Sequence, residues 1–403
     1  MARLVALFGL ALALLALPLR AQEFQTAATA AYVYDLSSGT VLFEKNADVP
    51  LPPASKLKLM TILMTFEALR SGQLTMDTTL PVSEAAMAYK GSSMFLNTMD
   101  RPTVSELLQG VIVLSGNDAT VVLAEALSPD GTEAGFARLM NARAQELGMT
   151  QSVFINSNGW PAEGQVMSMR DLAILAEHII VDFPEYYPMF AQQEYLFDGR
   201  VPSNTQNRNP ILGLGIGADG LKTGFSEEAG YGLVGSALQN GRRIIFVITG
   251  LPSMEARRTE AERIVNWAFR QFAFRELGAA GTRLAEAEVW MGEAPSVGLA
   301  LRDDLAVLTP ALAGGLTAEV VYQGPLPAPV QAGDEVAELV IRREGLPEMR
   351  VPLVAASSVA RGGFVPRMTT ALRAAMARAG LAVPLAAPDA AAGAEAGAPD
   401  GGA

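Results

Sequence analysis

Two β-hairpin patterns, far apart in the sequence, enclose a long helical segment. The first consists of residues Ala31–Leu36 and Thr40–Glu44, which flank a Ser-Ser-Gly turn. The second consists of Gly230–Ala237 and Arg243–Thr249, joined through Asn240-Gly241, a strong hairpin signal. Strands at both ends of a helical middle predict an α/β domain in which the N- and C-terminal segments share one sheet.

The segment between the hairpins has the apolar spacing of helices, and a different texture follows the second hairpin. Helical patterns run from Ser55 to Leu69, around 103–113, 119–126, 132–147 and 169–181, and after the second hairpin from 254 to 272. We assign residues 24–275 to this first domain. From Gly281 to Leu353, short β-like runs alternate with Pro/Gly turns, which predicts a small all-β domain at 282–360.

Both ends of the chain lie outside these domains. Arg3 precedes an apolar run from Leu4 to Leu17, which is too short to span a bilayer, so residues 1–21 have the layout of a secretory signal peptide. An uncleaved anchor is the alternative, and both interpretations send the bulk of the protein across a membrane. Residues 364–381 form an amphipathic helix pattern, for membrane contact or for packing on its own domain. Residues 386–403 are dominated by Ala, Gly, Pro and Asp, which predicts disorder.

Composition excludes several kinds of chemistry. The chain has no Cys and one His, so cysteine nucleophiles, thiolate metal sites and multi-histidine zinc sites are excluded. The single histidine, His178, lies in an apolar helical run, which favours a packing role. No metal or other cofactor is expected. The net charge of −12 argues against a nucleic-acid partner.

Ser55 and Lys58 form a Ser-x-x-Lys pattern, in which residues three apart on a helix are neighbours. A serine hydroxyl needs an adjacent base to become a nucleophile. A lysine can be that base if burial or nearby cations lower its pKa. Lys56 is the competing lysine, but it points about 100° away around a helix, so we expect Lys58 to be the base.

Two further motifs strengthen the functional interpretation of this Ser-x-x-Lys pattern. Ser115-Gly116-Asn117 follows an apolar run and precedes a helix, and Lys222-Thr223-Gly224 precedes the second hairpin. Alone, the first is an ordinary turn with a helix cap, and the second a cation at a strand edge. Together and in this order, the three motifs are typical of penicillin-binding proteins and class A β-lactamases.

On these residues the chain resembles serine-type D-alanyl-D-alanine carboxypeptidases, the low-molecular-mass penicillin-binding proteins of the DD-peptidase/β-lactamase superfamily. Further matching stretches are Gly91-Ser92-Ser93-Met94-Phe95, Asp118-Ala119, Asp219-Gly220-Leu221 and Glu228-Ala229-Gly230-Tyr231. The resemblance implies an antiparallel sheet flanked by a helical cluster, followed by a small all-β domain. It extends from about residue 25 nearly to residue 380.

The resemblance also implies a role for each motif residue. Ser55 would attack the carbonyl between two terminal D-alanines, Lys58 would take its proton, and Ser115 would relay a proton to the leaving nitrogen. Substrate would be bound by Asn117, Lys222, Thr223, Gly224 and Phe225. The family usually carries histidine at the position of Phe225, so here only a backbone N–H is expected, paired with that of Ser55 in an oxyanion hole.

We therefore expect an enzyme that trims peptidoglycan stem pentapeptides and is acylated by β-lactams. A β-lactamase is less favoured, because no Glu-x-x-Leu-Asn stretch lies between Ser115 and Lys222. A D,D-endopeptidase of the same superfamily and an inactive peptidoglycan-binding scaffold also remain possible. The expected location is the periplasm, with attachment to the outer face of the cytoplasmic membrane through 364–381 left open.

Overall fold

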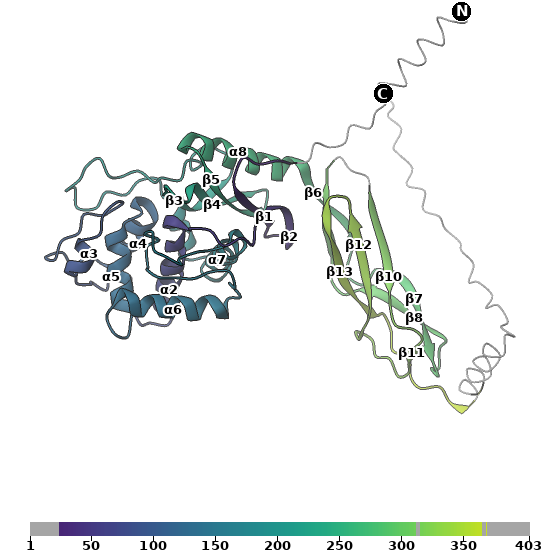
Figure 1. The fold of residues 1–403 in the computed structure, drawn as a ribbon. Helices are drawn as coiled ribbons and strands as arrows, with labels where there is room; N and C mark the ends of the chain where they lie inside the picture. Colours follow the sequence, from purple (N-terminus) through teal and green to yellow (C-terminus); the bar gives the residue numbers. More distant parts are fainter. Residues whose placement is uncertain (1–23, 312–314, 365–367, 369–403) are drawn as a thin grey trace, which may run out of the picture. The chain divides into compact units, whose positions relative to one another are not determined.

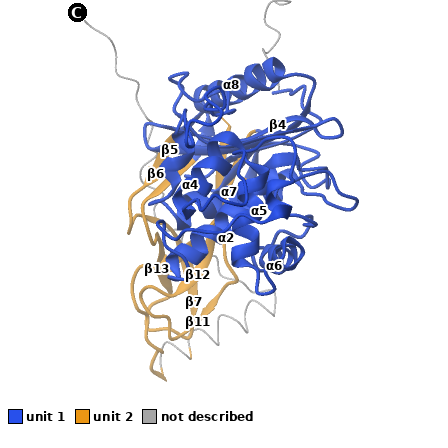
Figure 2. Cartoon of the chain, turned by 90° about the vertical axis from the view of Figure 1, so that its left-hand side faces the viewer, with its two compact units in different colours: residues 1–273, 308–313, 345–347 blue, residues 274–307, 314–344, 348–403 orange. Residues whose placement is uncertain are grey.

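The computed structural model describes residues 24–311, 315–364 and 368 (Figure 1). The described residues form two compact units, coloured separately in Figure 2: 24–273, 308–311 and 345–347 belong to one, and 274–307, 315–344, 348–364 and 368 belong to the other. The expected signal peptide at 1–21, the tail at 386–403 and, apart from Phe364 and Met368, the helix at 364–381 lie outside the described residues. Among the residues described, no helix is long and apolar enough to cross a membrane.

A five-stranded antiparallel sheet organises the first unit. Its strand order is β2-β1-β5-β4-β3, with β1 at Ala30–Asp35, β2 at Thr40–Lys45, β3 at Ala218–Ser226, β4 at Gly230–Gln239 and β5 at Arg242–Leu251. Strand β1 pairs with β5, with Val33 opposite Phe246. The prediction that N- and C-terminal strands share one sheet is confirmed. Strand β3, which was not predicted as a strand, forms the edge of the sheet.

The alternation of apolar residues along these strands separates two cores. Ile245 and Val247 of β5 belong to a core shared with the helical cluster, whereas Phe246 and Ile248 belong to a second core. Ile264, from helix α8 at Met254–Gln271, lies in that second core. Because successive side chains of a strand point to opposite faces, the sheet is covered on both sides. Figure 1 shows α8 on one side and the helical cluster on the other.

The helical cluster is formed by the segment between β2 and β3. Its helices are α2 at Lys58–Arg70, α3 at Glu84–Met87, α4 at Val104–Gln109, α5 at Asn117–Leu127, α6 at Glu133–Glu146 and α7 at Met169–Asp182; short turns are η1 at Ala54–Leu57, η2 at Gly110–Leu114 and η3 at Tyr187–Ala191. The start of α4 shows why helices begin where they do. The Thr103 hydroxyl accepts a hydrogen bond from the Glu106 N–H, and the Glu106 carboxylate accepts one from the Thr103 N–H.

One sequence expectation about local structure was wrong in detail, and another is confirmed with a change of helix type. Ser55 does not open the α-helix: it lies in the 3₁₀ turn η1, and Lys58 is the first residue of α2. Residues three apart eclipse one another in a 3₁₀ turn, so the Ser-x-x-Lys spacing still brings the two side chains together. The helix expected around 103–113 is confirmed: α4 covers Val104–Gln109, and its continuation, η2 at Gly110–Leu114, is π-helical.

The second unit is all β, as expected. A six-stranded sheet has the order β10-β12-β13-β8-β7-β11, and β6 pairs with β9. The bounds are β6 Phe272–Gly278, β7 Arg283–Trp290, β8 Ser296–Leu301, β9 Leu305–Pro310, β10 Leu316–Val321, β11 Leu326–Pro327, β12 Glu335–Arg343 and β13 Leu346–Ala355. This unit has its own apolar core, which includes Leu299, Ile341 and Leu353.

Candidate active site

Ser55 and Lys58 lie in direct contact at the start of the helical cluster. Lys58 Nζ is 2.8 Å from Ser55 Oγ and donates a second hydrogen bond of 2.6 Å to the Asn158 carbonyl. The Lys58 side chain is fully buried, whereas Ser55 is partly exposed. The Ser55 hydroxyl is therefore reachable from solvent, whereas the Lys58 amine beside it is shielded from solvent.

The environment lowers the pKa of Lys58 to about 7, mainly because burial disfavours the ammonium form. The cation of Arg208 adds to this effect, while Asp118 and Glu133 oppose it. About half of an amine with such a pKa is in the neutral form at pH 7, and this form can accept a proton.

Ser115 forms a second serine–lysine pair. It ends the turn η2 with a left-handed backbone (φ 61°), and its buried hydroxyl accepts a hydrogen bond of 2.9 Å from Lys222 Nζ. Burial lowers the pKa of Lys222 well below its usual range, and the cations of Lys58 and Arg208 lower it further. The fold thus brings Ser115 of the helical cluster to Lys222 of the sheet.

The Lys-Thr-Gly motif forms part of the edge strand β3. Lys222, Thr223 and Gly224 lie within the strand rather than at a turn before the hairpin, and Gly224 is paired with Gly232 of β4. Thr223 is buried, whereas the Phe225 ring is 51% exposed. That ring stacks on Tyr231, with centroids 4.2 Å apart and an angle of 29° between the planes. The side chain at this position is therefore apolar and held in place.

Asn117 and Asp118 connect helix α5 to the loop before it. Asn117 Nδ2 donates a 2.7 Å hydrogen bond to the Lys90 carbonyl. The buried Asp118 carboxylate accepts hydrogen bonds from the Ser93 hydroxyl and from the N–H groups of Met94 and Leu96, at 2.6 to 3.0 Å. It also accepts one from the Ala119 N–H. This carboxylate fixes the loop that carries the Gly-Ser-Ser-Met-Phe stretch.

Arg208 and Arg257 add positive charge to the site. Burial lowers the pKa of both, that of Arg257 to about 10. The Nε atom of Arg257 is buried and has no hydrogen-bond partner among the described residues, and its guanidinium lies over the Tyr231 ring. Arg257 was left open as a substrate contact by the sequence, and Arg208 was missed because it lies in a segment without a motif. The exposed Arg208 and the buried Arg257 together favour an anionic ligand.

The turn that contains Asn158 is held by Glu133. The Glu133 carboxylate accepts hydrogen bonds from the Ser157 N–H (2.9 Å) and hydroxyl (2.6 Å) and from Asn158 Nδ2 (3.3 Å). The next residue, Gly159, approaches turn η1, which carries the expected nucleophile Ser55 and is called the nucleophile turn below. A Cβ atom on Gly159 would lie 2.0 Å from the Ala54 carbonyl oxygen. The sequence carried no signal that the turn containing Asn158 supports the Lys58 amine.

Lys56 lies on a different side of the nucleophile turn. It is fully buried, and Lys56 Nζ donates a 3.2 Å hydrogen bond to Thr249 Oγ1 rather than contacting Ser55. Burial and Arg257 lower its pKa to about 7, the same value as for Lys58. Geometry, and not pKa, therefore distinguishes the two lysines.

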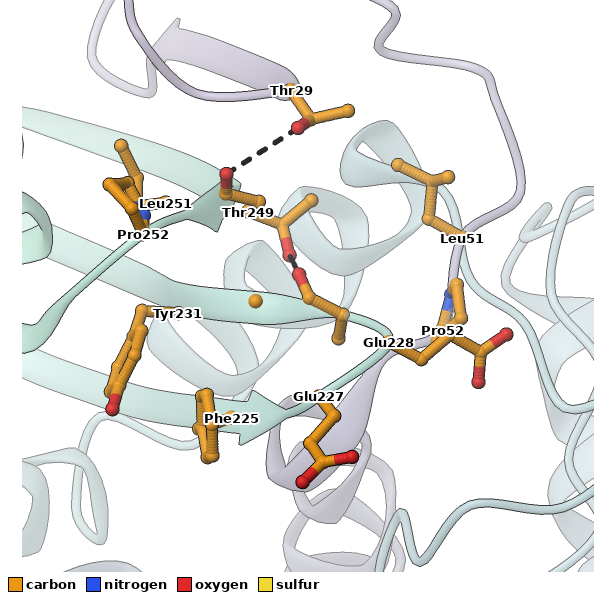
Figure 3. Close-up of a pocket in the computed structure, with 13 residues that line it drawn as sticks. Thr29, Leu51, Pro52, Phe225, Glu227, Glu228, Tyr231, Thr249, Leu251 and Pro252 are labelled. Atoms are coloured by element: carbon orange, nitrogen blue, oxygen red, sulfur yellow. Dashed lines mark hydrogen bonds between the residues drawn. The ribbon is translucent and has the colours of Figure 1, made fainter.

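A cavity of about 610 Å³ opens beside this constellation. Figure 3 shows Phe225 and Tyr231 on one side of it, with Glu227, Glu228 and Pro52 on the other. Phe225 and the Glu228-Ala229-Gly230-Tyr231 stretch line it, whereas Ser55 and Lys58 do not. His178 contributes neither to the cavity nor to the Ser55–Lys58 pair, since it contacts Asp182 on helix α7. No group of three or more His, Asp or Glu residues in the described ranges could hold a metal ion.

Comparison with known proteins agrees with this arrangement of motifs. Residues 18–253 match the family described as D-alanyl-D-alanine carboxypeptidase. The chain belongs to this family. Residues 272–361 match a second family, described as penicillin-binding protein 5, C-terminal domain. Membership makes the chain a serine peptidase of the penicillin-binding type.

Relatives extend the similarity over both units. The D-alanyl-D-alanine carboxypeptidase DacC of Escherichia coli (strain K12) is 34% identical over 344 residues, which cover 83% of this chain and 84% of that protein. The structure of penicillin binding protein 5 from Haemophilus influenzae has a TM-score of 0.72 and 31% identity, and covers 84% of this chain and 99% of that one. Penicillin-binding protein D2 of Listeria monocytogenes, solved in an ampicillin-bound form, has a TM-score of 0.55 and 31% identity, and covers 61% of this chain and 99% of that one.

Proposed function

We propose that this D-alanyl-D-alanine carboxypeptidase removes the terminal D-alanine of peptidoglycan stem pentapeptides through an acyl-enzyme on Ser55. The observation that carries the assignment of the nucleophile is the 2.8 Å contact between Ser55 Oγ and the buried Lys58 Nζ. A neutral Lys58 accepts the hydroxyl proton while one of its N–H groups donates to the Asn158 carbonyl. This second bond supports the role of Lys58 as base, because it leaves the nitrogen lone pair free to point at Ser55.

The second serine–lysine pair, Ser115 and Lys222, takes part in acylation by moving a proton. Ser55 Oγ attacks the carbonyl carbon of the penultimate D-alanine. Ser115 relays the proton that Lys58 took from Ser55 to the nitrogen of the leaving D-alanine, which leaves Lys58 neutral again. Lys222 supports this transfer because it holds the Ser115 hydroxyl at 2.9 Å. The terminal carboxylate binds at Thr223 and Lys222, within the positive field to which Arg208 and Arg257 contribute. Asn117 holds the substrate amide.

Two backbone donors stabilise the oxyanion that forms on the attacked carbonyl. They are the N–H groups of Ser55 and Phe225, from turn η1 and strand β3. Strand β3 supports this pairing, since it packs on the nucleophile turn so closely that a Cβ on Gly224 would lie 3.1 Å from the Pro53 carbonyl oxygen. Water, deprotonated by Lys58, then hydrolyses the ester and regenerates Ser55.

The test combines substrate turnover with trapping of the acyl-enzyme. The protein is incubated with diacetyl-lysyl-D-alanyl-D-alanine and, separately, with fluorescent penicillin, and Ser55→Ala is the control. We expect released D-alanine, a slowly lost label on the peptide that contains Ser55, and neither product from the control. Rapid turnover of penicillin would indicate a β-lactamase instead. Absence of both products from the unaltered protein would indicate the binding scaffold.

We further propose that the enzyme acts outside the cytoplasm, with residues 1–21 as its export signal and residues 364–381 as a peripheral membrane contact. The sequence patterns of these two segments are the support for this proposal. Fractionation of the full chain and of a chain truncated before Pro366 tests the second part. Loss of membrane association on truncation is the expected result, and equal association of both chains contradicts it.

A further inference from the structure

Lys56 is a buried amine that the proposed reaction leaves without a role. It follows the nucleophile directly, yet its side chain runs away from Ser55 and beneath the sheet. Its hydrogen bond of 3.2 Å joins it to Thr249, a residue 193 positions later. Any part that Lys56 plays in catalysis rests on the proposed acylation of Ser55.

Lys56 is connected to the end of strand β3 in two ways, by a chain of hydrogen bonds and by packing against glycines. Thr249 Oγ1, which accepts from Lys56, donates a 3.3 Å hydrogen bond to the Ala229 carbonyl. Figure 3 shows Thr249 beside the cavity that Phe225 also lines. Because Ala229 lies in the turn that connects β3 to β4, this chain of hydrogen bonds ties the nucleophile turn to the segment just beyond Phe225.

The second connection is the close packing of the Lys56 side chain against two glycines, Gly224 and Gly232. A Cβ on Gly224 would lie 3.0 Å from Lys56 Cγ, and one on Gly232 would lie 2.7 Å from Lys56 Nζ. Real Cβ atoms essentially never approach other atoms more closely than 3.0 Å. The Lys56 side chain therefore fills the space that the two absent side chains leave between turn η1 and strands β3 and β4.

This placement is costly for the folded protein. Lys56 is completely buried, and among the described residues its amine donates to the neutral Thr249 hydroxyl rather than to a carboxylate. The charged groups that act on it or that it acts on, Arg257 and Lys222, have the same sign. A buried amine without a carboxylate destabilises the fold, and an apolar residue of similar length would fill the same space at lower cost.

We propose that Lys56 is a positioning residue for acylation. Its stem sets the spacing between the nucleophile turn and Gly224, and its amine, anchored on Thr249, restrains the end of β3. The two proposed oxyanion donors, the N–H groups of Ser55 and Phe225, are thereby held at the distance that the attacked carbonyl requires.

The variants Lys56→Met, Thr249→Val and the double variant test this inference. Methionine keeps most of the stem and removes the amine, and valine removes the hydroxyl at similar volume. Lys45→Met is the matched control, because Lys45 is bonded to the Thr26 and Ala28 carbonyls and belongs to no proposed part of the site. The measurements are the rate constant of penicillin acylation, kcat and KM for the D-alanyl-D-alanine substrate, and Tm.

We expect Lys56→Met to acylate ~10-fold more slowly, with the loss mainly in kcat, because a displacement of part of an ångström at the reacting centre has about this effect. Thr249→Val is expected to slow acylation by a similar factor. The double variant should be no slower than either single variant, since both changes remove the same Lys56–Thr249 hydrogen bond. The Tm of Lys56→Met should rise. Burial lowers the pKa of Lys56 to about 7, so between pH ~7 and ~10.5 the unfolded chain binds more protons than the folded chain. Lys56 therefore destabilises the wild-type fold more at pH 7 than at pH 10. The gain in Tm on replacing Lys56 by methionine should be larger at pH 7 for the same reason.

Three outcomes would overturn the inference or its basis. Wild-type acylation rates in Lys56→Met would show that the amine has no positioning role. A fall in activity that parallels a fall in Tm would show a purely structural role. Failure of the unaltered protein to acylate would contradict the proposed function itself, and the inference would fall with it.

Discussion

The Lys58 amine lies 2.8 Å from the Ser55 hydroxyl, although the two residues belong to different elements. Ser55 is in the 3₁₀ turn η1, and Lys58 is the first residue of helix α2. The tighter winding of the turn places residues i and i+3 above one another. The contact therefore depends on the junction between turn and helix, and on the Asn158 carbonyl that orients the amine from the other side.

Replacing Lys58 by methionine should nearly abolish acylation. The variant keeps the length of the side chain but removes the base, a loss on the order of 10³-fold. Stopped-flow measurement of fluorescent penicillin binding checks this, with Lys45→Met expected to acylate at the wild-type rate. A Lys58→Met protein that is acylated as fast as Lys45→Met would exclude Lys58 as the base.

The pH dependence of acylation should report the Lys58 amine. Because the base acts in its neutral form, the acylation rate should rise with pH through about 7. The Arg208 cation lowers the pKa of Lys58, so Arg208→Gln should move the midpoint to higher pH. Arg257 acts on Lys56 and Lys222 instead, and Arg257→Gln should leave the midpoint unchanged. The reverse pattern would assign the titration to Lys56.

Ser115→Gly should separate the chemistry of Ser115 from its backbone. Ser115 has a φ of 61°, which glycine adopts without strain and alanine does not. The glycine variant should therefore fold without backbone strain while kcat falls ~100-fold, because the hydroxyl that relays the proton is absent. If D-alanine release persists at the wild-type rate in this variant, the leaving nitrogen is protonated by another group.

Asp118→Asn should destabilise the first unit. An amide nitrogen cannot accept hydrogen bonds, so at least some of the donors at Ser93, Met94, Leu96 and Ala119 lose their buried acceptor. Unsatisfied donors of this kind cost about 2–3 kcal/mol in the free energy of unfolding. Urea unfolding followed by near-ultraviolet circular dichroism measures this. The exposed Asp77→Asn serves as the control, with a change within ~0.5 kcal/mol. Equal stability of the two variants would mean that the 93–96 loop does not depend on this carboxylate.

Local patterns predicted the elements but not their details. The hairpins at 31–44 and 230–249 and the helical middle follow from short-range spacing, and the structure contains them. Strand β3 was missed because its Gly-rich sequence lacks strand alternation, and it is ordered by pairing with β4. The contribution of Arg208 was missed because its segment has no motif, and only the folded chain brings its charge close to Lys58.

The sequence by itself determined which residue types could carry the chemistry: with no cysteine and one remote histidine, a serine and a lysine were left, at a spacing that local winding brings together. Tertiary structure decided which groups meet. Ser115 and Lys222 are 107 positions apart, and Lys56 and Thr249 are 193 apart, yet each pair is joined by a hydrogen bond. Tertiary structure also decided which of the two lysines contacts Ser55. Both lysines are buried and have the same lowered pKa. Only the packing of β3, β4 and the Asn158 turn around them directs the Lys58 amine to Ser55 and the Lys56 amine to Thr249.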